Sequence, residues 1–153
     1  MTLNKRLVGD HMKIFEALRN DHDKQRALIK LLLGTHGDSD VRAEYYQQLK
    51  AELETHAVAE ERHFYAPLMQ LDNTVDLSRH GVAEHHQIDK FIAELDTLDM
   101  SSPQWLLTFK KLAHKVDHHL EEEEQEFFQQ AGRALSDGEK EKLADHYLTE
   151  MAS

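Results

Sequence analysis

Residues 52–65 read ELETHAVAEERHFY, and residues 116–128 repeat their pattern as VDHHLEEEEQEFF. In both stretches a histidine is followed four positions later by a glutamate: His56 and Glu60, then His119 and Glu123. Residues four apart lie about one turn apart on the same face of an α-helix. Both pairs also continue an apolar stripe that approaches each histidine at helical steps. The repeated stretch therefore predicts two helices that carry imidazole and carboxylate groups into a helical core.

The repeat extends outward to the helices that precede these stretches. Asp21-His22 aligns with Glu84-His85, and His56 follows His22 by 34 residues, as His119 follows His85. The apolar positions coincide as well: Ile29 with Ile92, Leu32 with Leu95, Leu49 with Leu112 and Leu53 with Val116. The glutamates and aromatic residues that follow also align: Glu60-Glu61 and Phe64-Tyr65 with Glu123-Glu124 and Phe127-Phe128. The chain therefore predicts two similar helical hairpins, each offering one histidine and one HxxxE pair.

With only 2 prolines and 6 glycines, and apolar residues at three- and four-residue steps, the whole chain reads as helical. Four long helices are expected at about 8–33, 41–66, 76–98 and 103–131. Because short connections make neighbouring helices antiparallel, the fold class is all-α, an up-down-up-down four-helix bundle. We expect one domain over residues 1–153.

Local signals mark the expected helix ends. Gly34 suits a left-handed stop of the first helix, and Pro67 should end the second. Ser102 and Pro103 supply a cap and a first-turn proline for the fourth helix. A capping box, Ser136 with Glu139, predicts a short fifth helix that ends near Met151 and packs across one end of the bundle.

Composition excludes several classes of function. The net charge of −11, from 29 acidic and 18 basic residues, argues against nucleic acid and anionic membranes as partners. The absence of cysteine excludes disulfides and thiolate sites, which leaves imidazole and carboxylate as the strong metal ligands. The opening MTLNKRLVGDHMKIF is not apolar enough for a signal peptide, and no later stretch is apolar enough to span a bilayer. We therefore expect a soluble cytoplasmic protein, a monomer or a homodimer.

Six residues of the repeat are candidate metal ligands: His22, His56, Glu60, His85, His119 and Glu123. Imidazole and carboxylate are costly in a core unless something satisfies them, and converging on divalent metal would do so. Two ions fit better than one, since two imidazoles from each hairpin can take one ion while both carboxylates bridge. Nitrogen and carboxylate ligands suit iron, although manganese, cobalt or zinc could replace it.

The repeat also decides between neighbouring candidates. His118 has the spacing of His119 but shares the stripe of Lys111 and Lys115, and His86 shares a face with Asp89. The ferritin-like pattern of two Glu-x-x-His pairs is present only once. Five other histidines and two glutamates are expected at the surface: His11, His36, His80, His114, His146, Glu121 and Glu122. Phe64, Phe109 and Phe127 are expected in the core.

Four stretches of the chain resemble the hemerythrin-like, or HHE cation-binding, domain family: NDHDKQRALIKLL, ELETHAVAEERHFY, AEHHQIDKFIAEL and VDHHLEEEEQEFF. The resemblance covers almost the whole chain. It implies a non-haem diiron site with bridging carboxylates and an oxo or hydroxo bridge, held by the six residues given above. Such sites in the family bind dioxygen, or sense or handle iron, oxygen, nitric oxide or peroxide.

The chain departs from the oxygen-carrying members of this family. Those members have a HxxxH pair on the third helix, but Gly81 stands four residues before His85 here. They also place aspartate five residues after the histidine of the fourth helix, where this chain has Glu124. A site with four histidine ligands instead of five has a coordination position open to water, oxide, substrate or a tyrosinate. Tyr45, Tyr46 and Tyr65 are the tyrosines that could approach it.

Two classes of function are consistent with these residues. We favour a protein that binds or senses a small ligand such as dioxygen or nitric oxide, or iron. The alternative is a diiron redox enzyme that acts on peroxide, and a metal-free helical interaction protein ranks last. The sequence identifies no redox partner.

Overall fold

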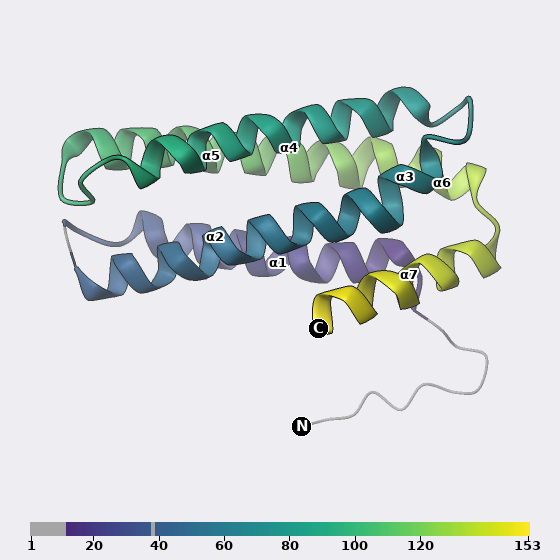
Figure 1. The fold of residues 1–153 in the computed structure, drawn as a ribbon, viewed down its shortest axis with the longest axis horizontal. Helices are drawn as coiled ribbons and strands as arrows, with labels where there is room; N and C mark the ends of the chain where they lie inside the picture. The colour runs from purple at the N-terminus through teal and green to yellow at the C-terminus, as the bar shows by residue number, and fades with distance from the viewer. Residues whose placement is uncertain (1–11, 38) are drawn as a thin grey trace.

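The computed structural model describes residues 12–37 and 39–153, which contain helices and no strand. Four long helices run alternately up and down (Figure 1): α1 (Ile14–Leu33), α2 (Asp40–Glu60), α4 (Val75–Asp96) and α5 (Pro103–Glu122). Shorter segments complete the chain: η1 (Glu61–Tyr65), α3 (Ala66–Leu68), η2 (Glu123–Phe127), α6 (Phe128–Ala134) and α7 (Asp137–Ala152). The expected all-α, up-down-up-down bundle with a fifth helix is confirmed. The expected start of the first helix near residue 8 lies outside the described residues.

The second and fourth helices both pass through a five-residue π-helix; η1 begins directly after Glu60, and η2 begins at Glu123. In η1 the wider turn is visible at Ala66, whose N–H bonds the carbonyl of Glu61 five residues earlier. π-Helical turns are rare in proteins, and those that occur are often located at functional sites. The two π-helices lie at nearly the same position of each hairpin, next to the HxxxE pairs. Their position therefore points to this part of the bundle as a functional site.

The conformation expected at the end of the first helix is wrong. Gly34 has φ −88°, so the first helix does not stop in a left-handed residue; the N–H of Gly34 bonds Leu31 and the Thr35 hydroxyl bonds the carbonyl of Leu32. These bonds satisfy the last carbonyls without glycine's conformational freedom. The second helix ends at Leu68, one residue after Pro67, so the end expected near Pro67 is confirmed. Pro67 itself takes a first-turn position of α3, where a missing N–H costs little.

The caps of the later helices follow the sequence. Ser102 accepts a hydrogen bond from the N–H of Trp105 at the start of α5, next to Pro103. Ser136 and Glu139 form the capping box of α7. That helix does not cross one end of the bundle, however; it packs alongside α1 and α2 (Figure 1), because the fully buried Ala144 and Tyr147 lie in the same apolar cluster as residues of α1.

The core consists of two apolar clusters at different levels of the bundle. One surrounds Phe64, Phe128 and Tyr147 near α3, α6 and α7, and the other surrounds Trp105 and Phe109 near the opposite end. The buried histidines and glutamates lie where each long helix passes from one cluster to the other. The fold thus encloses one polar layer between two apolar layers.

Within the described residues, no helix has both the length and the apolar character needed to cross a membrane.

Candidate metal centre

All six candidate ligands lie in the polar layer, and none is more than 4% exposed. They come from each of the four long helices and from η2: His22 from α1, His56 and Glu60 from α2, His85 from α4, His119 from α5 and Glu123 from η2. The helical repeat explains this placement, since each ligand-type residue continues the inward stripe of its own helix.

The six side chains form two groups of potential ligand atoms, each within 4.8 Å of one another. The first contains His22, His56, Glu60 and Glu123, and the second contains Glu60, His85 and His119. Glu60 belongs to both groups: its Oε1 lies 3.6 Å from His56 Nε2 and 3.0 Å from His85 Nε2. Glu123 also spans them, with Oε1 3.0 Å from His22 Nε2 and Oε2 3.6 Å from His119 Nε2. The arrangement has the expected form, with two histidines of one hairpin in each group and two carboxylates between them.

The outer nitrogen of each histidine faces a fixed partner. His22 Nδ1 lies 2.7 Å from Glu124, and His85 Nδ1 lies 2.7 Å from Glu61. The other two contacts are His119 Nδ1 with Glu84 at 2.8 Å and His56 Nδ1 with the Tyr147 hydroxyl at 2.6 Å. A hydrogen bond from Nδ1–H leaves a lone pair on Nε2 that points at the centre, which is the usual support of a metal-binding histidine.

The inner atoms of the cluster lack partners. Six buried atoms make no hydrogen bond: Nε2 of His22, His56 and His119, both carboxylate oxygens of Glu60, and Oε1 of Glu123. Unpaired buried polar atoms are rare in proteins, and each costs roughly 1–3 kcal/mol. Lone pairs that face one another at this distance need a cation between them. The residues therefore fit a bound metal.

Protons can take that place when metal is absent. Burial alone would lower the pKa of His56, but the Glu60 charge and the interaction with Asp21 raise it to about 10. Burial would likewise lower the pKa of His119, but its interactions with the Glu60 and Glu84 carboxylates raise it to about 10. A metal ion must displace these protons, so its apparent affinity falls as pH falls.

One tyrosine reaches the centre. The Tyr65 hydroxyl donates a hydrogen bond to Glu123, and its ring fills the space beside Gly81, where an added Cβ would overlap the phenol. Burial and the charge of Glu123 raise the pKa of Tyr65 well above its usual value, so in the absence of metal the phenol stays protonated. Tyr46 and Tyr45 are not at the centre: the Tyr46 hydroxyl bonds Asp96, and both rings pack with the Trp105 cluster.

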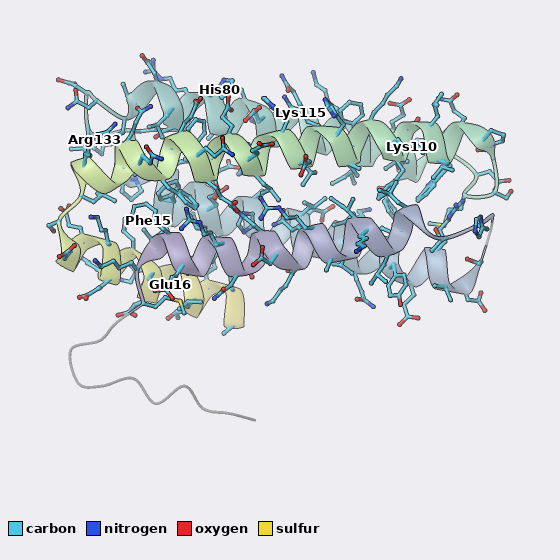
Figure 2. The ribbon with its side chains drawn as sticks, turned by 180° about the vertical axis from the view of Figure 1, so that it is seen from behind. Phe15, Glu16, His80, Lys110, Lys115 and Arg133 are labelled. Atoms are coloured by element: carbon cyan, nitrogen blue, oxygen red, sulfur yellow. The ribbon has the colours of Figure 1, made fainter. Side chains whose placement is uncertain are left out.

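The neighbouring residues set aside from the sequence point away. His118 and His86 are exposed, as are His36, His80, His114 and His146, whereas His11 lies outside the described residues. The Glu124 carboxylate is occupied by His22 and by both terminal nitrogens of Arg26, so it does not face the centre. At the outer edge, Glu84 and Glu122 meet His80 and Lys115, which lie on the exposed side of α4 and α5 (Figure 2). These contacts form an ion-pair network that balances charge next to His119.

The model of the hemerythrin HHE cation binding domain matches residues 13–131, which is most of the chain. The chain belongs to this family. The match covers both hairpins and the buried histidine and glutamate clusters, and the family name indicates that this hemerythrin HHE domain binds metal cations. The resemblance inferred from the four sequence stretches is confirmed. The match ends before α7, which begins at Asp137.

Two other proteins are similar to this chain. A crystal structure of a hemerythrin HHE cation binding domain-containing protein from Mycobacterium kansasii superposes with a TM-score of 0.84 at 21% identity. The superposition covers 92% of this chain and 86% of that one. A protein named DNA nickase from Nostoc sp. is 24% identical over 136 residues, which is 89% of this chain but 38% of the relative. The chain thus spans less than half the length of that relative.

Sequence reasoning missed the partners of the outer nitrogens in this hemerythrin HHE domain. Three of them, Glu61, Glu84 and Glu124, lie directly beside a candidate ligand, and the repeat aligns Glu61 with Glu124 and Glu84 with Asp21. That alignment was the available signal, since a carboxylate repeated next to each ligand suggests a supporting role. Tyr147 has no counterpart in the repeat, and no sequence signal pointed to it.

Proposed function

We propose that this chain holds two iron ions in its polar layer and uses them to bind a small ligand such as dioxygen or nitric oxide, or to bind iron itself. The proposed ligands are the six residues of the repeat: His22, His56, Glu60, His85, His119 and Glu123. His22 and His56 hold one ion, His85 and His119 hold the other, and the two glutamates bridge. Manganese or zinc can substitute, because the donor set does not distinguish strongly among these metals.

The observation that carries this proposal is the contrast between the two sides of the histidines. Every outer nitrogen has a partner at 2.6–2.8 Å, whereas Nε2 of His22, His56 and His119 lacks one. A structural histidine needs no such arrangement, because one hydrogen bond on each side would satisfy it. Orienting the outer side and leaving the inner lone pair free is what a metal ligand requires.

Two iron ions supply electron exchange with small oxygen and nitrogen ligands when they are bound. The chain's own residues determine what reaches them. Glu60 and Glu123 hold negative charge between the two histidine groups, and the aromatic side chains of Tyr65, Phe127 and Phe128 keep water from one side. Because Gly81 has no side chain, the Tyr65 phenol occupies the space that a fifth imidazole would need.

A small cavity on the other side limits the size of the ligand. It has a volume of about 10 Å³ and is lined by His56, His85 and His119 together with apolar Leu53, Ile88 and Val116. That volume is close to the minimum that holds a single water molecule. A diatomic molecule or peroxide approaches this size, and an organic substrate does not. The cavity thus supports a small-molecule function.

Gln25 is the buried amide of this cavity. It is 1% exposed, it lines the cavity, and its Nε2 has no hydrogen-bond partner. The repeat places apolar Ile88 at the matching position of the second hairpin. We infer that the Gln25 amide donates a hydrogen bond to the small ligand.

The Gln25→Leu variant tests the small-ligand function. We expect the iron-loaded, oxidised variant to keep both ions but to bind azide roughly fivefold to tenfold more weakly, since a hydrogen bond contributes about 1 kcal/mol. The azide dissociation constant, followed by the absorption of the iron–azide complex, measures this. The exposed Gln48→Leu serves as control. Equal azide affinity in wild type and Gln25→Leu would show that the Gln25 amide does not bind the ligand.

The alternative function is a diiron enzyme that converts two peroxide molecules to dioxygen and two waters. One observation favours it: the buried Tyr65 hydroxyl contacts Glu123 and offers a proton donor within the centre. Oxygen evolution distinguishes the two. A binding protein gives a spectral change that is complete at one ligand per site, whereas an enzyme evolves dioxygen over many turnovers.

Nucleic acid is not a proposed partner. The Nostoc relative's name belongs to a protein of which this chain matches 38%, and the chain carries 29 acidic against 18 basic residues. Such a charge balance opposes phosphate binding. A metal-free interaction protein is also disfavoured, because it leaves the unpaired inner atoms of the cluster without a purpose.

A further inference from the structure

The two hairpins support one of their histidines differently. In the second hairpin Glu84 contacts His119 Nδ1 directly, at 2.8 Å. The aligned residue of the first hairpin is Asp21, which is shorter by one methylene, and its Oδ2 lies 3.8 Å from His56 Nδ1. That separation is too long for a hydrogen bond. The repeat is therefore broken at this one contact.

A residue from outside the repeat closes the gap. The Tyr147 hydroxyl lies 2.6 Å from His56 Nδ1 and donates its own hydrogen to Asp21. Because a hydroxyl has one hydrogen, the Tyr147 oxygen must accept from His56. His56 therefore carries its hydrogen on Nδ1 and presents its Nε2 lone pair to the centre.

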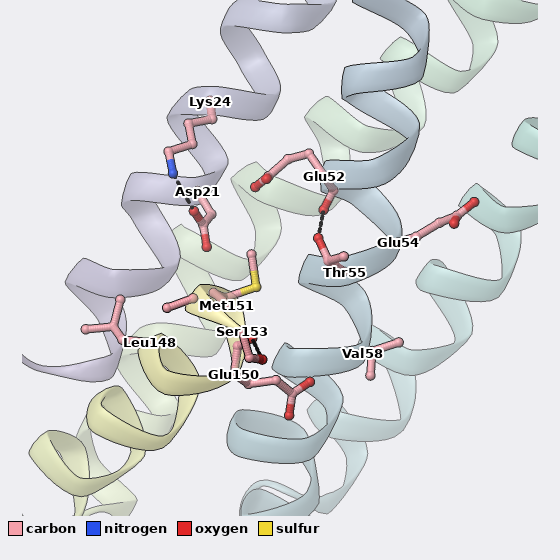
Figure 3. A pocket seen from close by; sticks show the side chains of 11 residues that line it. Asp21, Lys24, Glu52, Glu54, Thr55, Val58, Leu148, Glu150, Met151 and Ser153 are labelled. Atoms are coloured by element: carbon pink, nitrogen blue, oxygen red, sulfur yellow. Dashed lines mark hydrogen bonds and ion pairs between the residues drawn. The ribbon is translucent and has the colours of Figure 1, made fainter.

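The fifth helix holds this hydroxyl in place. Tyr147 is fully buried in α7, and Ala144 one turn earlier is also fully buried in the same apolar cluster. Asp21 is fixed from its other side by Lys24, whose Nζ lies 3.4 Å from its carboxylate. Figure 3 shows Asp21 and Lys24 at the edge of a groove that is also lined by Glu52 of α2 and Met151 of α7. The chain His56–Tyr147–Asp21 thus runs from the candidate centre to the surface between α1 and α7.

We propose that Tyr147 is a positioning residue that α7 contributes to the metal centre and that makes the two metal positions unequal. This inference rests on the proposed diiron function. A carboxylate that accepts from a histidine raises the basicity of the ligand nitrogen, and a neutral phenol does so less. His56 is therefore a weaker donor than His119, and the ion at His22 and His56 binds second and is lost first.

Three variants test this inference. Tyr147→Phe removes the hydroxyl and keeps the ring. Asp21→Glu combined with Tyr147→Phe rebuilds the direct contact of the second hairpin, because one added C–C bond extends the carboxylate by about 1.5 Å. Tyr46→Phe is the matched control, since it removes a buried hydroxyl that bonds Asp96 in the other apolar cluster.

The measurement is anaerobic titration with ferrous iron against a competing chelator, which resolves the two binding steps. We expect Tyr147→Phe to weaken one step by roughly tenfold to a hundredfold, the usual effect of losing such a partner, and to leave the other step within about threefold. The double variant should recover most of the loss, and Tyr46→Phe should match wild type in both steps. A general loss of structure would weaken both steps and would not be recovered by a longer carboxylate.

The outcomes separate the inference from the proposed function. If wild type binds two ions and Tyr147→Phe binds both with unchanged affinity, the role of Tyr147 is wrong and the diiron centre stands. If Tyr147→Phe weakens both steps equally and the double variant does not recover them, Tyr147 acts only through stability, and the inference is overturned. If wild type itself takes up no iron, both proposals fail.

Discussion

Replacing His119 by alanine should remove at least one of the two irons per chain, whereas replacing the adjacent His118 should leave both. The two residues share the same spacing to a glutamate four positions on, but the His119 side chain is 3% exposed and the His118 side chain 57%. His119 Nε2 faces Glu60 and Glu123, and His118 faces solvent. Iron per chain after anaerobic reconstitution and desalting measures the difference.

The adjacent pair is a stringent comparison because both variants change the same residue type on the same helix. His119→Ala also leaves Glu84 without its partner, so a loss of stability is expected in addition. Circular dichroism therefore accompanies the iron measurement and shows whether the variant is still helical. If His118→Ala lost iron and a folded His119→Ala retained it, the metal centre would lie on the His118 face of α5, which contradicts the proposed ligand set.

Removing metal should lower the melting temperature by roughly 10 °C or more. An ion present at a thousand times its dissociation constant stabilises the folded state by about 4 kcal/mol, and each 1 kcal/mol shifts the midpoint by about 2–4 °C in a chain of this size. The buried carboxylates Glu60 and Glu123 also repel one another when no cation separates them. Differential scanning calorimetry of iron-loaded and chelator-treated protein measures the shift.

Reloading the chelated protein with zinc provides the control. We expect zinc to restore most of the midpoint, because the histidine and carboxylate ligands accept it. A midpoint that stays within about 2 °C after all metal is removed would instead favour the metal-free helical interaction protein. In the metal-free state, protons on His56 and His119 replace part of the missing positive charge. They reduce the loss of stability but do not abolish it.

The bundle and the candidate ligands were accessible from sequence because one pattern encodes both. A residue that continues an apolar stripe is directed into the core whatever its chemistry, so the position of His119 relative to Leu112 and Val116 already orients it. The second copy of the pattern then separates inward residues from outward ones, as with His118 and Glu122. The six side chains consequently lie together in the structure.

The features that the sequence did not predict depend on contacts between distant segments. Tyr147 reaches His56 only because α7 packs alongside α1, and the capping box that predicts this helix does not determine where it packs. Tyr65 fills the space at Gly81, and a glycine alone does not reveal which side chain occupies the room it leaves.

The iron content, together with the EPR spectrum of the oxidised protein, shows whether one chain holds two iron ions close together. We predict two irons per chain after anaerobic reconstitution, and no signal from isolated high-spin ferric ions after oxidation, because the two ions are coupled through their shared ligands. One iron per chain, or two irons that give the spectrum of isolated ferric ions, would contradict the diiron centre.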